Sequence, residues 1–407
     1  MADKLLSSTS ITVGSRYTGN FNTDFIVRDV EKKMYLLEPS SYPLFSYLFL
    51  QKKKSVQTAN YLTKHEWGED ELLPASDTLS AAATGGGATM TITPAEPALF
   101  RLGTKIRFEE TDETGTVTTW SATTPTVTKD SGTWTSVSNG TRIILMGEAY
   151  SEVQAPTQYV KTSKVMFYNY CQIFSKLVSF SERMIMSTMN GGTYNGNDWD
   201  AEMEKKAKEM KRDIELAFWF NGAAALATTN GVNTTHTAGI LSQIYDRGGL
   251  YQPYTGAIEE DAWDNFLSKK KIGSNKVTAF AGLDAAANLE KVVKARYSNI
   301  GMVRKYGAIE PQGDALSVMQ YFGFGLEVDI IRVPLWEGKY SKYVVLLDDD
   351  FVKLQHAAPD DKGSRKMRTE QLVKADGTPL KEAQLKADVG VDIINAKTAQ
   401  VLYPSAT

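Results

Sequence analysis

The stretch Trp199–Gly222, WDAEMEKKAKEMKRDIELAFWFNG, decides how this chain folds. Its apolar residues recur every three or four positions, which predicts one long helix with a single apolar stripe. The stripe consists of Trp199, Met203, Ala207, Met210, Ile214, Ala217 and Phe218. Asn197 or Asp198 can cap the start of this helix, and Asn221-Gly222 supplies the stop. At about 1.5 Å per residue the helix forms a rod of roughly 36 Å, far longer than an average helix.

The composition is that of a chain that can bury a real core. It has 407 residues, 42% hydrophobic and 23% charged, which excludes disordered and collagen-like classes and suggests about two or three domains. A net charge of -3 argues against a protein whose main function is to bind nucleic acid, because phosphate binding needs a concentrated basic face. The single cysteine, Cys171, excludes an internal disulfide. No run approaches the roughly 18 apolar residues of a membrane span, so we expect a soluble protein with no membrane partner.

Residues that carry chemistry are sparse. The three histidines lie far apart and in no metal or catalytic motif, at His65, His236 and His356. Asp348-Asp349-Asp350 could bind a hard cation, although such a run more often ends a buried strand in a solvated turn. Lys52–Lys54 and Lys269–Lys271 could touch phosphate, although such clusters more often form a wet loop or a helix end. We therefore expect no enzyme, no catalytic residues, no cofactor and no metal.

The first half of the chain is thin and extended. Residues 1–23 form a polar arm, and Asp24–Leu37 has the periodicity of an amphipathic helix. A loop at 56–180 then carries a threonine-rich β module at 88–147 between two extended segments, like a hairpin with a knob at its tip. The strands expected in the module are Thr104–Phe108, Gly115–Trp120, Pro125–Thr128 and Thr141–Met146.

The second half has the mixed pattern of a compact α+β domain. Helices are expected at Glu259–Leu267 and Asp284–Arg296. Strands are expected at Lys276–Ala281, Leu326–Val333, Lys342–Leu347 and Phe351–His356. The chain closes on a second hairpin, in which Lys366–Ala375 and Lys386–Leu402 run extended around the turn at 376–379.

This order of elements, together with three sequence motifs, resembles the major capsid proteins of tailed bacteriophages. In EPSSYPLFSYLFLQKKKSVQTANYLTKHEWGEDELLPA, a docking segment and a Glu-Trp-x-x-Asp-x-Leu segment match the family at Pro43, Leu44, Phe45, Ser46, Glu66, Trp67, Asp70 and Leu72. The long helix is similar to the family's spine helix, with its Lys-Arg-Asp-Ile-Glu core. YVVLLDDDFVKLQH is similar to a late strand of the family. Each motif is weakly specific, and their order and spacing carry the resemblance.

The resemblance implies an α+β chain with the Hong Kong 97-type capsid fold. Its expected parts are an N-terminal arm with a short helix (1–55), an extended loop with a β insertion (56–180, insertion 88–147), the spine helix and first part of a peripheral domain (181–235), an axial domain (236–357) and the C-terminal hairpin of the peripheral domain (358–407). Spine-helix packing is assigned to Trp199, Met203, Met210, Ile214 and Phe218.

The implied function is self-assembly of an icosahedral shell around double-stranded phage DNA. The expected partners are further copies of the chain in hexamers and pentamers, a portal, cement or scaffolding proteins, and DNA held without sequence specificity. The expected location is the virion capsid, assembled in the host cytoplasm. The arm and the loop 56–180 are too thin to bury their own apolar residues, so we expect them to lie on neighbouring subunits. Candidate interface residues are Phe45, Trp67, Tyr168, Tyr170 and Phe174.

Two other interpretations stay open at this point. An encapsulin-like compartment would share the fold and load protein cargo. A virion surface protein could bind carbohydrate through the β module, where Trp120 and Trp134 could stack on sugars, although two tryptophans in such a module are more often core.

Overall fold

The chain forms two compact units in a computed structural model. The model describes residues 42–50, 55–57, 64–150, 159–186, 198–229, 232–297, 318–359, 363–372 and 380–405. The main unit comprises Met1–His65 and Asn169–Thr407, and the loop unit comprises Glu66–Tyr168. The predicted arm, the predicted helix at 24–37, Lys52–Lys54 and the turn at 376–379 lie outside the described residues.

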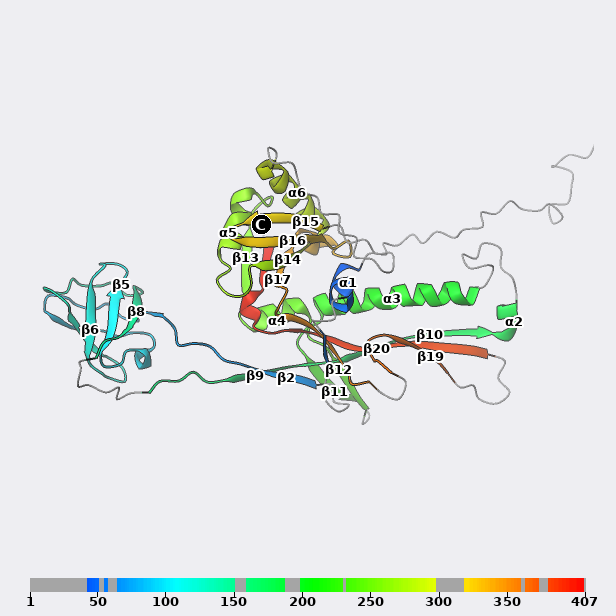
Figure 1. Ribbon diagram of the computed structural model, residues 1–407, viewed down its shortest axis with the longest axis horizontal. Helices are drawn as coiled ribbons and strands as arrows, with labels where there is room; N and C mark the ends of the chain where they lie inside the picture. The colour runs from blue at the N-terminus through cyan, green and yellow to red at the C-terminus, as the bar shows by residue number, and fades with distance from the viewer. Residues whose placement is uncertain are drawn as a thin grey trace, which may run out of the picture. The chain divides into compact units, whose positions relative to one another are not determined.

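The long helix α3 (Asp198–Phe220) is the axis of the main unit and lies along a sheet that we call the spine sheet (Figure 1). The spine sheet has the strand order β1-β18-β20-β10, and β19 also pairs with β20. Ten successive residue pairs join β10 to β20 in antiparallel register, from Gln172↔Val389 to Ser181↔Leu380. Its strands are β1 (Ser55–Gln57), β10 (Gln172–Ser181), β18 (Val352–His356), β19 (Arg368–Gln371) and β20 (Leu380–Ile393).

A second, six-stranded sheet of the main unit has the order β13-β21-β17-β14-β16-β15, and we call it the main sheet. Its strands are β13 (Leu250–Tyr254), β14 (Lys276–Ala281), β15 (Val318–Gly323), β16 (Leu326–Arg332), β17 (Val344–Asp348) and β21 (Gln400–Pro404). Buried residues of α5 (Glu260–Ser268) and α6 (Leu283–Tyr297) pack against its strands in one cluster. The remaining elements are α1 (Pro43–Leu50), α2 (Glu182–Met186), α4 (Ile240–Asp246), the pair β11 (Ala225–Thr229) and β12 (Val232–His236), and the 3-10 turns η5 (Gly338–Lys342) and η6 (Ala396–Thr398).

The loop unit contains a six-stranded antiparallel sheet with the order β3-β8-β5-β6-β7-β4. These strands are β3 (Ser76–Thr78), β4 (Thr89–Thr91), β5 (Thr104–Phe108), β6 (Thr114–Thr119), β7 (Thr126–Lys129) and β8 (Arg142–Glu148), with the 3-10 turn η4 at Pro97–Leu99. Its own apolar cluster includes Ile92, Phe100, Ile106 and Phe108, each fully buried. A separate ribbon pairs β2 (Lys64–Glu69) with β9 (Val165–Tyr170).

The apolar core of the loop unit overturns one expectation drawn from the sequence, that for the loop 56–180. The loop 56–180 was expected to bury little on itself, yet the module forms its own apolar cluster and β10 is the edge strand of the spine sheet, paired with β20. The module is also larger than 88–147, because Leu79 and Ala83 belong to its core and β3 pairs with β8. The physical reason is that six paired strands make a face that one hairpin cannot.

The closing segment differs from the prediction as well. Lys386–Leu402 is not one extended run, because Asn395 adopts φ 53° and η6 turns the chain after β20. β21 then pairs with β13 and β17 in the main sheet, rather than with the hairpin expected over 358–407. In the same way β18, expected in the axial segment 236–357, pairs with β20 in the spine sheet.

Candidate assembly interface

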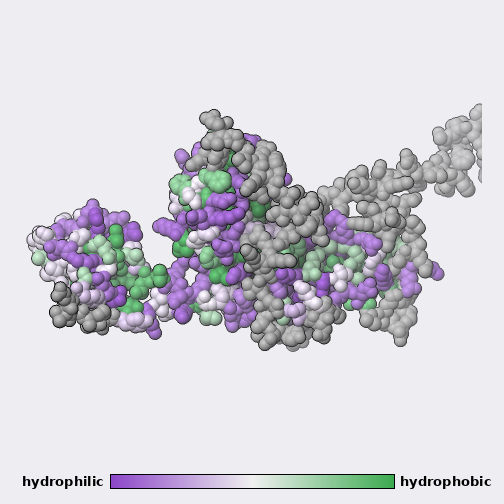
Figure 2. Space-filling view, viewed as in Figure 1, coloured by the Kyte–Doolittle hydropathy of each residue, from purple (hydrophilic) through white to green (hydrophobic). Residues whose placement is uncertain are grey.

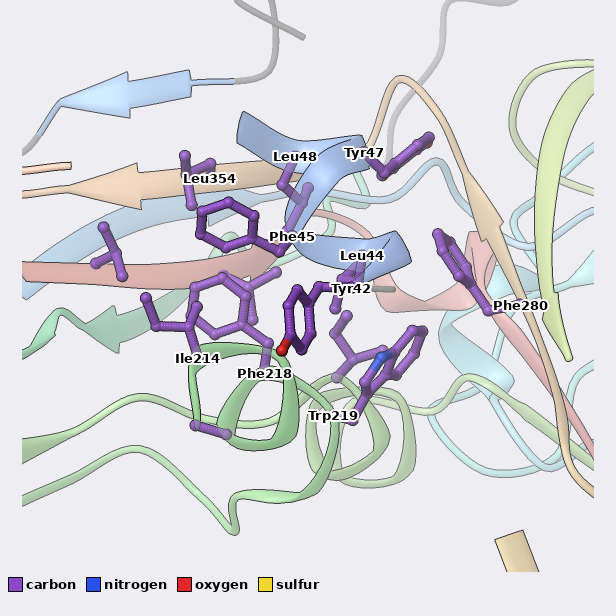
Figure 3. Close-up of a cluster of buried hydrophobic side chains, with 14 of the residues drawn as sticks. Tyr42, Leu44, Phe45, Tyr47, Leu48, Ile214, Phe218, Trp219, Phe280 and Leu354 are labelled. Carbon is purple, nitrogen blue, oxygen red and sulfur yellow. The ribbon is translucent and has the colours of Figure 1, made fainter. Parts of the chain in front are cut away.

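Helix α1 is the docking segment of the chain and lies between α3, the spine sheet and the main sheet (Figure 3). The sequence PLFSYLFL is apolar on all sides, which suits a helix surrounded by protein, and Pro43 occupies its first position. Phe45 and Leu48 lie beside Leu354 of β18 and Ile214 of α3, while Leu44 and Tyr47 lie toward Trp219 and Phe280 (Figure 3). The segment was expected to dock, but its helical form was not predicted.

A buried carboxylate on α3 holds the start of α1. Glu215 is fully buried and accepts hydrogen bonds from Leu44 N at 3.1 Å and Phe45 N at 2.6 Å. The indole Nε1 of Trp219 donates to the same carboxylate at 3.1 Å. Burial raises the pKa of Glu215 to about 7, and the three donated hydrogen bonds oppose that rise. Glu215 therefore takes the place of a local cap, since Tyr42, directly before Pro43, is not a capping residue type.

The acidic run ends the buried strand β17 in a turn, as the commoner interpretation expected, with Asp350 exposed and Asp348 buried in a polar centre. Asp348 is fully buried and pairs with Lys270 Nζ at 3.0 Å. It also accepts hydrogen bonds from Ser274 N at 2.6 Å and Asp350 N at 3.1 Å. Gly273 approaches the Asp348 carboxylate where a Cβ would collide, with φ at 101°. Among the described residues, no group of three or more His, Cys, Asp or Glu side chains is placed to hold a metal.

Both strands of the ribbon are tied to β20 at their main-unit ends. His65, on β2, places Nδ1 2.8 Å from Oδ2 of the fully buried Asp392. Asn169, on β9, is fully buried and donates Nδ2 to the Val391 carbonyl at 2.6 Å. Its Oδ1 accepts from Ala238 N and Tyr170 N, both at 2.8 Å. These buried bonds fix where the ribbon leaves the main unit.

Beyond these anchors the ribbon exposes apolar side chains. Val165, Met166 and Tyr168 of β9 are 50%, 64% and 44% exposed. Met166 lies against Gly68 of the partner strand, and the Trp67 and Phe167 rings lie 6.5 Å apart on the ribbon. A two-stranded sheet has no second layer to cover such residues.

The five candidate interface residues fall into different environments. Phe45 and Phe174 are each 8% exposed and belong to the core cluster of the main unit, so their burial needs no second subunit. Trp67 is buried on the ribbon beside Phe167 and donates Nε1 to Glu69 at 2.8 Å. Tyr170 is half-buried and Tyr168 is exposed.

The spine-helix residues share one cluster. Met210, Ile214 and Phe218 are fully buried, Trp199 is buried against Phe180, and Met203 is partly buried at the same cluster. Residues that sequence reasoning missed are mostly polar: Glu215, Lys270, Asn169 and Asp392. Lys270 and Asp348 were noted only as members of charge runs, and nothing in the sequence pairs them.

The two tryptophans of the β module differ in their exposure to solvent. Trp134 is 2% exposed and packs edge-on against Phe108 at 5.3 Å, so it is unavailable to a sugar. Trp120 is 47% exposed. None of the helices in the described ranges combines the length and apolar character that crossing a membrane requires.

Known proteins share this architecture. The family model described as SU10 major capsid protein matches residues 16–402. The capsid of cyanophage A-1(L) matches with 8% identity and a TM-score of 0.52, over 96% of this chain and 100% of that chain. The capsid of a native GTA particle matches with 11% identity and a TM-score of 0.47, over 96% and 99%. The holo-SrpI encapsulin complex of Synechococcus elongatus PCC 7942 matches with 14% identity and a TM-score of 0.38, over 60% and 77%. A search of curated proteins gives no match.

The fold is therefore the Hong Kong 97-type fold of tailed-phage capsid proteins, as the resemblance implied. The chain belongs to the SU10 major capsid protein family, because that family's model spans nearly all of it. It is a structural protein that forms a homo-oligomeric capsid of the virion, and it is not an enzyme. The encapsulin-like alternative is not favoured.

Proposed function

We propose that copies of this chain assemble in the host cytoplasm, as hexamers and pentamers, into a closed icosahedral shell around double-stranded phage DNA. A portal occupies one opening of the shell, and scaffolding or cement proteins bind the shell. The DNA is held without sequence specificity. Family membership over residues 16–402 is the observation that supports this proposal most.

The division into an arm, an extended loop, a spine segment, an axial segment and a peripheral closing segment is part of the same proposal. Within it, the β2–β9 ribbon makes contacts between subunits. Its base is fixed by Asn169 and His65, while Tyr168 and Met166 remain exposed. Burial of such side chains contributes roughly 25 cal/mol per Å² of apolar surface. Many such contacts, each weak, make assembly correctable and the finished shell stable.

The charge balance supports containment rather than tight binding of DNA. The net charge of -3 leaves no excess of cations to hold phosphate. A shell with weakly binding walls would let DNA move in during filling and out during ejection.

Electron microscopy of the purified full chain tests the proposal. We expect closed, thin-walled icosahedral particles, and we expect particles from infected cells to protect duplex DNA from nuclease. A chain that stays monomeric at high concentration would contradict it. The variant Tyr168→Asp should form fewer particles than the matched variant Leu226→Asp, since Leu226 on β11 is a 50% exposed apolar residue of the main unit to which no subunit contact is assigned.

A further inference from the structure

A cavity of about 170 Å³ opens on the loop unit beside β8. Its walls are mostly apolar and come from segments before β3, in η4, on β8 and after the β module. They include Leu73, Pro74, Leu99, Leu145 and Val160. An apolar cavity of about 150 Å³ is large enough to bind benzene. This cavity therefore has room for one aromatic or branched side chain.

Exposed apolar side chains accompany the cavity in the same unit. Leu72 is 93% exposed and directly precedes Leu73 of the wall, and Tyr159, 86% exposed, directly precedes Val160. Met146 of β8 is 49% exposed and follows Leu145. Figure 2 shows hydrophobic surface among hydrophilic residues on the loop unit. Exposed apolar groups around an apolar hollow are typical of a docking surface.

One polar side chain of the cavity wall, Arg101, also favours a docked segment. Arg101 pairs through Nη2 with Glu148, which also accepts a hydrogen bond from Tyr150. The Nε atom of Arg101 is buried and has no hydrogen-bond partner within the described part of the chain. A buried donor without a partner is costly, so a shift of the Arg101 side chain that let this donor meet a peptide carbonyl of a docked segment would be stabilised.

Charge identifies the occupant. The loop unit, Glu66–Tyr168, carries 13 acidic and 7 basic residues, a net charge of -6, whereas the main unit carries 35 acidic and 38 basic residues, a net charge of +3. Part of the negative charge lies next to the cavity, because Asp70 accepts a hydrogen bond from Thr162 at 2.7 Å, two residues beyond Val160 of the wall. Two loop units would repel each other, whereas a loop unit and a main unit attract.

We propose that this cavity receives an apolar side chain from the main unit of a second copy of the chain, an inference that rests on the proposed shell. The main unit exposes aromatic side chains that could enter, among them Tyr245 on α4 and Phe324 in the β15–β16 turn. Docking would bury the Leu72 and Tyr159 side chains and give Arg101 Nε an acceptor.

Photo-cross-linking from the rim tests the inference. The full chain carries p-benzoylphenylalanine at position 72 or, separately, 159, and heavy-isotope and unlabelled subunits are mixed before assembly so that links between chains are recognised. In particles we expect links from both positions to residues 169–407 of another copy. Particles that give links only within one chain, only to residues 66–168 of another copy, or none would overturn the inference while leaving the shell intact. Failure to form any particle would overturn the shell proposal, and the inference with it.

A substitution gives a second measurement. Leu72→Asp should raise the subunit concentration needed for assembly by about tenfold, the effect of losing roughly 1.4 kcal/mol at one apolar contact. Because Leu72 is almost fully exposed, the folded subunit should keep its thermal transition. Trp120→Asp is the matched control, since Trp120 is an exposed apolar residue of the loop unit and, unlike Leu72, does not adjoin a residue of the cavity wall in sequence. Equal assembly of the two variants at the wild-type concentration would contradict the proposal.

Discussion

Single buried polar residues connect the elements of this protein. Glu215 joins α3 to the start of α1 across 171 positions of sequence, and Lys270 joins the loop after α5 to Asp348 across 78. The apolar stripe of α3 could be predicted because its period is local. These polar partners could not be predicted, since a carboxylate 171 residues away leaves no periodic signal near Pro43.

The pKa of Glu215 gives a prediction on pH. Burial raises this pKa from 4.5 to about 7, so between these values the folded state keeps a proton that the unfolded chain has lost. The contribution of Glu215 to the free energy of unfolding is therefore full below pH 4.5 and falls as the pH rises toward 7. Glu215→Gln removes this titration. Relative to wild type, the variant should gain about 2–3 kcal/mol between pH 5 and pH 8, measured by urea unfolding of unassembled subunits.

The matched control for that series is Glu204→Gln on the same helix, where Glu204 pairs with Lys208 near the surface. Its unfolding free energy should run parallel to that of the wild type over the same pH range. A Glu215→Gln curve that also runs parallel to the wild-type curve would contradict the role assigned to Glu215.

The buried pair of Lys270 and Asp348 gives a second prediction at this scale. Lys270→Met should lower the free energy of unfolding by about 3–5 kcal/mol, because it leaves the fully buried Asp348 without its cation. Lys269→Met, at the exposed neighbouring position, should change it by less than about 0.5 kcal/mol. Chemical denaturation at one pH compares the two, and similar losses would show that the pair contributes little.

At the scale of elements, local pattern predicted most of the strands and helices. β5 and β14 coincide with the predicted ranges, α5 and α6 differ by one residue at each end, and β18 differs by one residue at its start. The failures have tertiary causes. α1 was not recognised as a helix because its sequence is apolar on every side, and β21 was joined to β20 because the left-handed Asn395 between them has no sequence signal strong enough to break an extended run.

The separate core of the loop unit leads to a prediction for that unit alone. Phe108 is fully buried there and packs on Trp134, so Phe108→Ala should destabilise the loop unit by about 3–5 kcal/mol. Hydrogen exchange followed by mass spectrometry should show faster exchange across residues 76–148 and unchanged exchange in α3 and β20. Ile214→Ala, in the main-unit core, should give the reverse pattern. Uniformly faster exchange in both variants would mean that the two cores unfold as one.

At the scale of the whole molecule, each of the two units buries an apolar core of its own, and a few apolar surfaces stay exposed on a single chain. The main unit and the β module bury their own apolar residues, including Phe45 and Phe174, which were expected at subunit contacts. The β2–β9 ribbon differs, because Val165, Met166 and Tyr168 stay exposed beyond well-anchored ends. Sequence could predict a thin loop there, and could not predict how much of that loop folds on itself.

Hydrogen exchange of the ribbon, compared between free subunits and assembled particles, tests the shell account most directly. We expect amides of residues 64–69 and 165–170 to exchange rapidly in the free subunit, except next to the anchors at His65 and Asn169, and to become strongly protected in particles. Equal protection of the ribbon before and after assembly would contradict the claim that neighbouring copies cover it.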